Sequence, residues 1–464
     1  MKIIITQGAS QKGLWPAGRN FCFSAENELY DGALLLQNVY KLAVSAAGEK
    51  NTVIAADMFQ FDDIKSALSK LPQKPQIINA PFDRGSAGVI ASMLKQIQGK
   101  KDETVIIIPA DISIKSPKAF KEALEEARTA VKKGYSAIIG VSASNAEESS
   151  GWMLAGEAKK PPFPVIEMHA AFDTQPSLEL RKQKNFFWNT GIYAGKLSVL
   201  LEGIKQAAPA LIEDDEQVKQ EENLEITEEA DIIEHQEISF DSAVFEKIEK
   251  KAVIELKSKW RNFGLWQSVY AAKEKDGNGN AASGRVSLYK TSNSLVFSSK
   301  EHTAVSSIDG MLVVNTDDVL LVCPKDRALD VIKLAGEIKK HYKDTQAASR
   351  TVIRPWGFYT CLNRGSNWLT KAITVSPHSK ITLQQHKYRS EHWVVLDGEA
   401  SVFLDGEVTA VEKGGSINIP AGAKHSLRNL TDEPLKIIEV QKGGYISEDD
   451  IIRYDEEAEE TETV

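Results

Sequence analysis

Short apolar runs recur through the first part of the chain at spacings typical of buried strands. Five of them, rich in β-branched residues, lie at 2–6, 52–56, 76–80, 104–111 and 136–143. Between these runs, DDIKSALSKL (62–71) and PKAFKEALEEARTAVKKG (117–134) place apolar residues three and four positions apart, as in amphipathic helices. The alternation predicts a largely parallel sheet covered by helices.

The pattern changes after residue 273. EKDGNGNAASG (274–284) concentrates Gly, Asn and Asp and marks a loop or a domain boundary. Short strand-like pieces follow it and predict a small β element, and DRALDVIKLAGEIKKHYKD (326–344) then predicts a helix. From RPWGFYTCL (354–362) onward, turn residues and alternating strand patterns are dense, as in a small β-barrel or jelly roll.

These patterns predict an α/β protein of four segments. They are a Rossmann-like α/β domain at 1–273, a β-rich linker element with a helix at 274–348, a barrel domain at 349–455 and an acidic tail at 456–464. The tail has almost nothing to bury, so we expect it to be disordered. A length of 464 residues also exceeds what one hydrophobic core normally organises.

Composition narrows the classes of function. The formal net charge of -9 leaves no excess of positive charge to follow a nucleic-acid backbone, so we expect no nucleic-acid partner. Three widely spaced cysteines without a CxxC pair argue against a disulfide framework or a thiolate zinc site. No signal peptide or membrane-spanning run is evident, and we expect a cytoplasmic protein.

Ligands of such sheets bind beyond the carboxyl ends of the strands. That rule directs attention to the loop after Thr6, which contains Gly8, and to Asp111, which follows the run VIIIP. The acidic stretch 213–237 is instead predicted to be a solvated helix or loop rather than a metal site.

The strongest constellation of candidate ligands lies in ITLQQHKYRSEHWVVLDGEASVFLDG (381–406). Gln384 and His386 are two residues apart, so on a strand they point to the same face. Glu391 follows, and His425 comes later. The turn residues of the pattern accompany these four: Gly398, Gly414, Pro420, Gly422 and Asn429. This is the two-part pattern of a cupin barrel, with Gln384 where many cupins place a histidine.

Two imidazoles, a carboxylate and an amide oxygen can hold a divalent metal such as zinc and leave a position open for substrate or water. A lone histidine is more often a satisfied polar group than a ligand. Four candidates at this spacing, with the turn residues in place, favour a metal site. His392 neighbours Glu391 and would point to the opposite face of a regular strand, so it is not among the expected ligands.

A family resemblance rests on four stretches: RPWGFY, LQQHKYRSEHWVVLDGEA, IPAGAKHSLRN and PLKIIEVQKGGYISEDDIIRYD. Together they resemble, over residues 351–455, the C-terminal domain of type II mannose-6-phosphate isomerases, a family in which the isomerase is fused to a mannose-1-phosphate guanylyltransferase. The resemblance implies interconversion of mannose 6-phosphate and fructose 6-phosphate. That reaction moves a proton between C1 and C2, and a metal would stabilise the enediolate oxygen.

The resemblance also suggests roles for residues around the metal. Some side chain must act as the base: Glu391 is a ligand here, and Glu439, Glu448 and a metal-bound hydroxide are the alternatives. The candidate cations for catalysis and for the phosphate lie within the matched motifs and are Arg389, Arg453, Lys387 and Lys424. Each could equally be a surface charge.

Two departures from the family's pattern concern this domain. Tyr388 stands where the family usually has histidine, and RYDEEAEETETV does not reproduce a final tyrosine-glycine-arginine. If that arginine contributes to catalysis, isomerase activity is reduced.

The first domain resembles the sugar-nucleotide pyrophosphorylases to which such isomerases are fused. The matching pieces are LWP (14–16), Arg19, PAD (109–111), FWNTGIY (187–193), ISFDSAVFEK (238–247) and WRNFGLW (260–266). The resemblance implies that Gly8, Lys12 and Arg19 belong to a nucleotide-binding loop. It also implies that Asp111 binds Mg²⁺ if the site is active.

Several charged residues of that family are replaced. Ala9, Gln11, Lys12 and Gly13 stand for the loop's second glycine, third glycine, threonine and arginine. Met168 replaces a lysine that holds the sugar phosphate, and Asn262 replaces the second metal aspartate. Ala80 and Gly85 stand for a glutamate and an asparagine. A charge-assisted contact contributes roughly 1.5 to 3 kcal/mol, so three losses would cost on the order of 10³ to 10⁶ in rate or affinity.

Three hypotheses follow. The protein is an isomerase whose guanylyltransferase is weakened or lost, or it retains both activities, or it is a non-catalytic protein that binds sugar phosphates or a partner. Its expected ligands are sugar phosphates, joined by GTP and GDP-mannose if the first domain is active. The sequence leaves homo-oligomerisation open.

Overall fold

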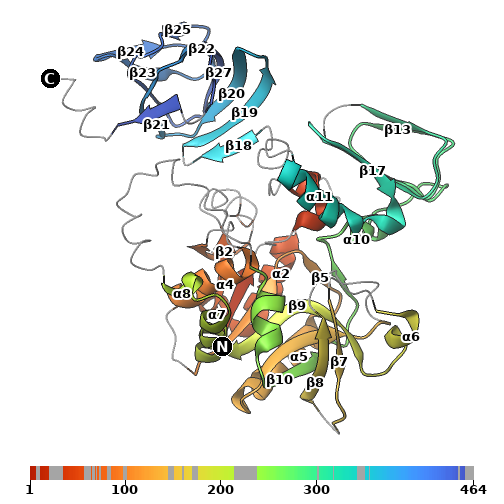
Figure 1. The fold of residues 1–464 in the computed structure, drawn as a ribbon. Coiled ribbons are helices and arrows are strands. Elements are labelled where there is room, and N and C mark those ends of the chain that lie inside the picture. The colour runs from red at the N-terminus through yellow and green to blue at the C-terminus, as the bar shows by residue number, and fades with distance from the viewer. Residues whose placement is uncertain are drawn as a thin grey trace. The chain divides into compact units, whose positions relative to one another are not determined.

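The computed structural model describes most of the chain. The described residues are 1–6, 11–19, 35–56, 64, 68, 71–72, 75–80, 85–97, 102–144, 151–158, 161–169, 176–213, 238–299, 302–316, 318–341, 351–354, 356–447 and 450–454. They form two compact units, one within residues 1–346 and the other chiefly within residues 347–464. Each unit is described separately below (Figure 1).

A nine-stranded sheet is the centre of the first unit. Its strands in spatial order are β3 (Gln76–Asn79), β2 (Thr52–Ala56), β1 (Lys2–Thr6), β4 (Thr104–Pro109), β9 (Phe186–Lys196), β6 (Ser136–Val141), β10 (Lys251–Glu255), β8 (Phe163–His169) and β7 (Trp152–Ala155). The neighbours from β3 to β4 are parallel, as are β6 and β10. Strand β9 is antiparallel to both β4 and β6. The prediction of a largely parallel sheet is therefore correct except for this inserted strand and the β7–β8 edge.

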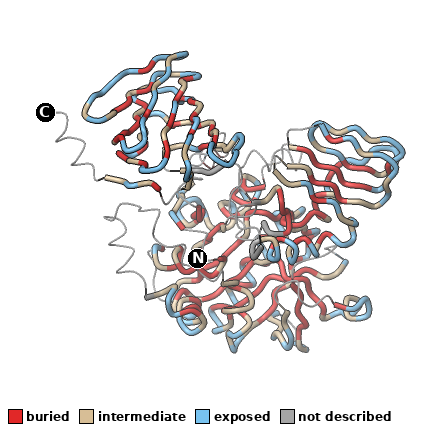
Figure 2. Tube along the Cα trace, turned by 45° about the horizontal axis from the view of Figure 1, so that its top comes forward, coloured by how far each residue is buried: buried red, intermediate tan, exposed pale blue. Residues whose placement is uncertain are grey.

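Helices cover both faces of this sheet (Figure 1). On one face α2 (Leu35–Ala47) and α5 (Pro117–Lys132) share an apolar cluster with Ile3 and Ile5. On the other, α4 (Gly85–Gln96) and α7 (Leu197–Ala207) pack with Ile4. Burial on both faces explains why the strands are continuous apolar runs rather than alternating ones, and Figure 2 shows buried residues along these strands.

Helix α5 begins where the sequence predicts. Ser116 accepts a hydrogen bond from the Ala119 backbone N–H at 3.2 Å, and Pro117 occupies the first helical turn. The shorter elements of the unit, apart from the linker strands, are η1 (Gln11–Leu14), η2 (Ala17–Arg19), η3 (Glu49–Asn51), β5 (Ile112–Ile114), α6 (Leu178–Arg181), α8 (Ala210–Glu213), η5 (Phe240–Val244), η6 (Phe245–Lys247), β11 (Trp260–Asn262) and α10 (Trp266–Ala272).

The predicted β element folds as stacked parallel strands. They are β12 (Ala281–Ser283), β14 (Leu295–Ser298) and β16 (Met311–Asn315), beside a second stack of β13 (Val286–Tyr289) and β15 (Thr303–Ser306). Strand β17 (Leu320–Pro324) closes one edge, and η7 (Lys325–Arg327) and α11 (Asp330–His341) follow. Ala281, Leu295 and Leu312 lie in register and are buried. Gly284 permits one tight turn, because a Cβ there would lie 1.9 Å from the Ser298 carbonyl oxygen.

The second unit is a barrel of two antiparallel sheets. One has the order β18 (Thr351–Arg354), β19 (Gly357–Arg364), β20 (Trp368–Val375), β27 (Leu435–Gly443), β22 (Arg389–Asp397) and β25 (Ser416–Ile419). The other has the order β24 (Glu407–Val411), β23 (Ala400–Leu404), β26 (His425–Arg428), β21 (Lys380–His386) and β28 (Ile451–Arg453). Alternate residues of these strands fill the interior with an apolar cluster that includes Val375, Trp393 and Leu427.

The predicted fold class is confirmed: an α/β domain, a β element and a β-barrel follow one another. Within the predicted helix at 62–71 the structure describes Ile64 and Leu68, which are helical, and Leu71, which is not. Most of the acidic stretch 213–237 and the tail at 456–464 lie outside the described residues. No helix among the residues that the structure describes is long and apolar enough to cross a bilayer.

Candidate functional site

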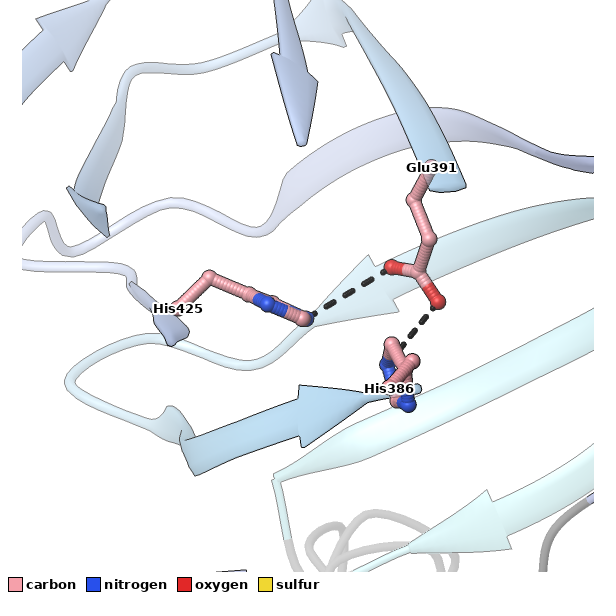
Figure 3. A group of neighbouring side chains, drawn as sticks. All are labelled: His386, Glu391 and His425. Atoms are coloured by element: carbon pink, nitrogen blue, oxygen red, sulfur yellow. Dashed lines mark ion pairs between the residues drawn. The ribbon is translucent and has the colours of Figure 1, made fainter. Parts of the chain in front are cut away.

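Three strands of the barrel bring the predicted metal ligands together. Gln384 and His386 lie at the end of β21 with buried side chains, and His425, the first residue of β26, is in register with Gln384. Glu391 is the third residue of β22. Figure 3 shows the side chains of His386, Glu391 and His425 pointing toward one another. Strand alternation thus places these residues inside the barrel, as their spacing predicts.

The ligand atoms of the triad lie within 4.8 Å of one another. The Glu391 carboxylate is between the two imidazoles: Oε1 is 3.0 Å from His386 Nε2 and Oε2 is 3.7 Å from His425 Nε2. The Gln384 amide Nε2 lies 3.4 Å from His425 Nε2. All four side chains therefore converge on one buried point.

These residues fit a divalent cation by their donor chemistry. His425 Nδ1 lies 3.0 Å from the Ala423 carbonyl oxygen, so this nitrogen carries the proton and Nε2 is free to be a ligand. Turning the Gln384 amide by 180° would present its oxygen at the same place. His386 Nδ1 is buried without a hydrogen-bond partner among the described residues, so Nε2, which faces Glu391, is the nitrogen in position to bind a metal.

The pKa shifts of Glu391 and His425 also favour metal binding. Burial would raise the pKa of Glu391, but the hydrogen bond from His386 and the charges of the two imidazoles outweigh it, so the pKa lies well below its usual range. Burial also lowers the pKa of His425, although the carboxylate of Glu391 opposes this shift. An ionised carboxylate and a neutral imidazole are the forms that bind metals.

Arg389 places a permanent positive charge beside the triad. Its Nε donates to Glu391 Oε1 at 3.2 Å, and its Nη2 is 3.4 Å from His386 Nε2. On the other side, Nη1 donates to the Ser447 carbonyl at 2.7 Å and lies 3.9 Å from Asp450 Oδ2. The Arg389 side chain is 2% exposed, so the guanidinium is fixed by these contacts and has little contact with solvent.

The other predicted cations surround the site less closely. Arg453 on β28 is in register with Gln384. Lys424 Nζ lies 4.8 Å from the centre of the Tyr454 ring, and Lys387 is exposed, with Nζ 5.0 Å from the centre of the Tyr388 ring. Glu448 lies outside the described residues. His392 is exposed whereas Glu391 is buried, as the alternation predicts.

Sequence reasoning named Glu439 only as a candidate base and missed the other residues that support the triad. Trp393 and Gln441 donate to Glu391, Lys371 is buried beside Glu439, and Asp450 accepts hydrogen bonds from the Lys387 and Tyr388 backbone N–H groups at 3.0 and 3.1 Å. Strand alternation offered one signal: Lys371, Glu439 and Gln441 occupy core-facing positions where apolar residues are expected.

In the first unit, Asp111 follows β4 and is 8% exposed. Burial raises the pKa of its carboxyl to about 6. The Phe263 backbone N–H donates to the Asp111 carbonyl at 2.7 Å, and Asn262 on β11 is in register with Ile112 on β5. Asp111 thus lies in the bend directly before β5, the strand that pairs with β11. Asn262 Oδ1 accepts a hydrogen bond from the Gly264 N–H at 2.7 Å.

The predicted nucleotide loop is described only in part. Gly8 and Ala9 lie outside the described residues, as do the side chains of Lys12 and Arg19. Beyond them, the loop packs closely against the segment after β11: the Trp266 indole donates to the Trp15 carbonyl at 3.0 Å. A Cβ on Gly13 would lie 2.3 Å from the Gly264 carbonyl oxygen. This backbone therefore excludes an arginine, or any side chain, at position 13.

Met168 is the residue for which the resemblance predicts a sugar-phosphate lysine. Met168 on β8 is half-buried against the apolar cluster. Its neighbours pair with each other, since His169 Nε2 is 2.8 Å from Glu167 Oε1. The His169 ring stacks on Trp152 with centroids 4.3 Å apart. Neither lysine nor arginine occurs within the stretch 167–169.

Family models match the chain in three consecutive stretches. A nucleotidyl transferase model matches residues 28–279, which is more than half of the chain. The chain belongs to the nucleotidyl transferase family. A MannoseP isomerase/GMP-like beta-helix domain matches residues 284–338 of this family member, and a mannose-6-phosphate isomerase C-terminal domain matches residues 341–456. This order is that of the bifunctional guanylyltransferase/isomerase family that the motifs predicted.

Relatives match this member of the nucleotidyl transferase family along nearly its whole length. It is 29% identical over 474 residues to the alginate biosynthesis protein AlgA of Pseudomonas aeruginosa, covering 98% of this chain and 96% of that one. It is 29% identical over 465 residues to a mannose-1-phosphate guanylyltransferase of Salmonella muenchen, covering 97% of each. A crystal structure of a Thermus thermophilus protein, titled mannose-1-phosphate geranyltransferase, aligns with a TM-score of 0.54 at 20% identity, covering 73% of this chain and 99% of that one. The structural likeness supports the fold.

Proposed function

We propose that the barrel unit is a metal-dependent isomerase that interconverts mannose 6-phosphate and fructose 6-phosphate. The observation that carries the proposal is the convergence of His386, Glu391 and His425 within 4.8 Å, with Gln384 beside them. The match to the mannose-6-phosphate isomerase C-terminal model over residues 341–456 supports this substrate class.

In this proposal Gln384, His386, Glu391 and His425 hold a divalent cation, with zinc as the expected metal. The cation would act as a Lewis acid toward the negative oxygen that develops when a proton moves between C1 and C2. Arg389 keeps a second positive charge next to the same point and stabilises that oxygen electrostatically. Arg453 lies on the strand beside Gln384 and, with Lys387 and Lys424, is the proposed binder of the sugar phosphate. Glu448 stays a prediction for the base.

We further propose that guanylyl transfer in the first unit is weakened or lost. Asp111 remains, but its neighbour Asn262 is a neutral and weaker ligand for Mg²⁺. Met168 supplies no charge, and the approach of Gly13 to Gly264 leaves no room for the family's arginine. Positioning and charge stabilisation supply nearly all of the catalysis in phosphoryl transfer. These changes would weaken both contributions.

Retention of both activities is the second candidate. The observation that favours it is the match to the Salmonella muenchen mannose-1-phosphate guanylyltransferase, which covers 97% of each chain. In that case GTP, mannose 1-phosphate and Mg²⁺ are ligands of the first unit, and the protein supplies GDP-mannose for polysaccharide synthesis. Under either candidate the substrates are sugar phosphates.

The direct test is turnover by purified protein loaded with zinc or cobalt and supplied with fructose 6-phosphate. We expect mannose 6-phosphate to form and His386→Ala to lower kcat/KM at least about 10³-fold, because a ligand of the proposed metal is removed. His392→Ala is the matched control, since His392 follows Glu391 on β22 but is exposed. Metal-loaded protein that binds sugar phosphates without turnover would instead indicate a non-catalytic binding protein.

A further inference from the structure

A second carboxylate lies directly behind the metal-binding one. Glu439 is on β27, next to β22 in the six-stranded sheet, and its residue is 4% exposed. Its cross-strand neighbours are Trp393 on one side and Lys371 on the other. Two carboxylates buried this close together would repel each other. Hydrogen-bond donors or cations beside them are therefore needed to stabilise the pair.

Two donors join the carboxylates in a closed ring of hydrogen bonds. Gln441 Nε2 is 3.0 Å from Glu391 Oε1 and 3.1 Å from Glu439 Oε2. Trp393 Nε1 is 3.2 Å from Glu391 Oε2 and 3.2 Å from Glu439 Oε1. An amide nitrogen has two hydrogens and can serve both carboxylates, whereas the single indole hydrogen is shared. Each of the four carboxylate oxygens therefore has a donor in the ring.

Lys371 closes the arrangement on the far side. Its Nζ lies 3.9 Å from Glu439 Oε2 and 4.4 Å from the centre of the Tyr359 ring, and its side chain is 8% exposed. A buried ammonium is costly unless it is paired. Here it offsets the charge of the carboxylates from the side that faces away from the triad.

We infer that Glu439, Gln441 and Lys371 are positioning residues that fix the Glu391 carboxylate between His386 and His425 and so set the affinity of the site for its metal. The inference rests on the proposed metal-dependent function of the barrel. Without the ring, Glu391 could turn about its side-chain torsions, and the two oxygens would no longer face the two imidazoles. Outer partners of metal ligands commonly contribute about 10- to 100-fold in metal affinity.

The test measures metal binding as well as activity. Gln441→Met keeps the side-chain volume but removes the bridging donors, and Lys371→Met removes the ammonium. We expect zinc affinity, from competition with a chromophoric chelator, to fall about 10- to 100-fold in each, and the visible absorption of the Co²⁺-loaded protein to change. Val440→Thr and Lys442→Met are the controls, because these residues lie on β27 but are more exposed.

A conservative variant separates positioning from simple support of the fold. Glu439→Gln retains an acceptor for Trp393, so we expect it to bind zinc more tightly than Glu439→Leu. If Glu439→Leu does not fold, the Gln441 and Lys371 variants decide the matter. Folded Gln441→Met and Lys371→Met proteins with wild-type zinc affinity and an unchanged Co²⁺ spectrum would overturn this inference alone. Wild-type protein that takes up no metal would overturn both it and the proposed function.

Discussion

The candidate metal site of the barrel and the predicted nucleotide site of the first unit differ in how many of their expected charged residues are present. In the barrel, every predicted ligand is present, buried and in contact with its neighbours, and Glu391 alone is within 3.2 Å of donors from Arg389, Trp393 and Gln441. In the first unit Asp111 is buried directly before β5, but Asn262 and Met168 stand where the resemblance predicts charged residues.

This difference shows that a fold and its chemistry are maintained by different residues. The apolar clusters on both faces of the nine-stranded sheet need only volume and burial. Transfer of a nucleotidyl group needs particular charges at particular positions. A unit can therefore keep a well-packed sheet after the charges that made it a transferase have changed.

Removing the metal should produce the largest effect, and it should affect the barrel unit but not the first unit. Dialysis against a strong chelator is expected to lower isomerase activity at least about 10³-fold. Without the metal, no Lewis acid would stabilise the negative charge of the enediolate. Added zinc or cobalt should restore it. Circular dichroism and the thermal unfolding of the first unit should not change. Full activity after verified removal of the metal would contradict the proposed role of His386, Glu391 and His425.

Restoring charges to the first unit should have the next largest effect. The double variant Asn262→Asp, Met168→Lys returns a second carboxylate beside Asp111 and a cation near the sugar phosphate. We expect formation of GDP-mannose from GTP and mannose 1-phosphate to rise about 10- to 10³-fold, as charge-assisted contacts of roughly 1.5 to 3 kcal/mol predict. Asn278→Asp, in the exposed turn of the β element, is the control. No gain, or a fall, would mean that these substitutions do not limit the activity.

A smaller effect is expected from Asp450→Asn. This carboxylate accepts from the Lys387 and Tyr388 backbone N–H groups and lies 3.9 Å from Arg389 Nη1. Losing its charge should loosen Arg389 and lower isomerase kcat about 10-fold, with little change in zinc affinity. Asp432→Asn serves as the control, because the Asp432 side chain is 95% exposed. Equal kinetics in the two variants would show that Asp450 does not position Arg389.

The smallest effect concerns stability and pH in the first unit. Burial raises the pKa of the Asp241 carboxyl to about 6, although the hydrogen bond from Tyr193 opposes the shift. Its ordinary value is about 3.9. Between about pH 4 and 6 the folded unit therefore binds more protons than the unfolded chain, and its free energy of unfolding falls as pH rises.

Asp241→Asn should remove this slope. Relative to the wild type, we expect the variant to gain up to about 3 kcal/mol between pH 4 and pH 7, measured by urea unfolding with a signal from the first unit. Asp102→Asn is the control, since its side chain is 81% exposed. Parallel pH profiles for the wild type and Asp241→Asn would show that Asp241 does not titrate in this window.

The shared orientation of two of the candidate metal ligands could be predicted because it is local. Gln384 and His386 share a face through the two-residue period of a strand. The supporting layer could not be predicted in the same way. Glu391 meets Gln441 fifty positions away, and Lys371 meets Glu439, through strand pairings that no short stretch of sequence specifies.

The same limit applies to the sheets. The strand runs of the first unit were visible as β-branched segments, but the insertion of β9 between β4 and β6 is a pairing of distant segments. The stacked register of Ala281, Leu295 and Leu312 is likewise non-local. The close approach of Gly13 to Gly264 joins positions about 250 residues apart and leaves no space for a Cβ at position 13.

The central claim is that the two sites of one chain have diverged in activity. Its most direct test measures both reactions on one preparation: fructose 6-phosphate to mannose 6-phosphate with zinc, and GDP-mannose formation from GTP and mannose 1-phosphate with Mg²⁺. We expect isomerisation that His386→Ala abolishes, and guanylyl transfer that is at least about 10³-fold slower than a typical enzymatic rate of about 10 s⁻¹. Guanylyl transfer at an ordinary rate, or no isomerisation by metal-loaded protein, would contradict the account.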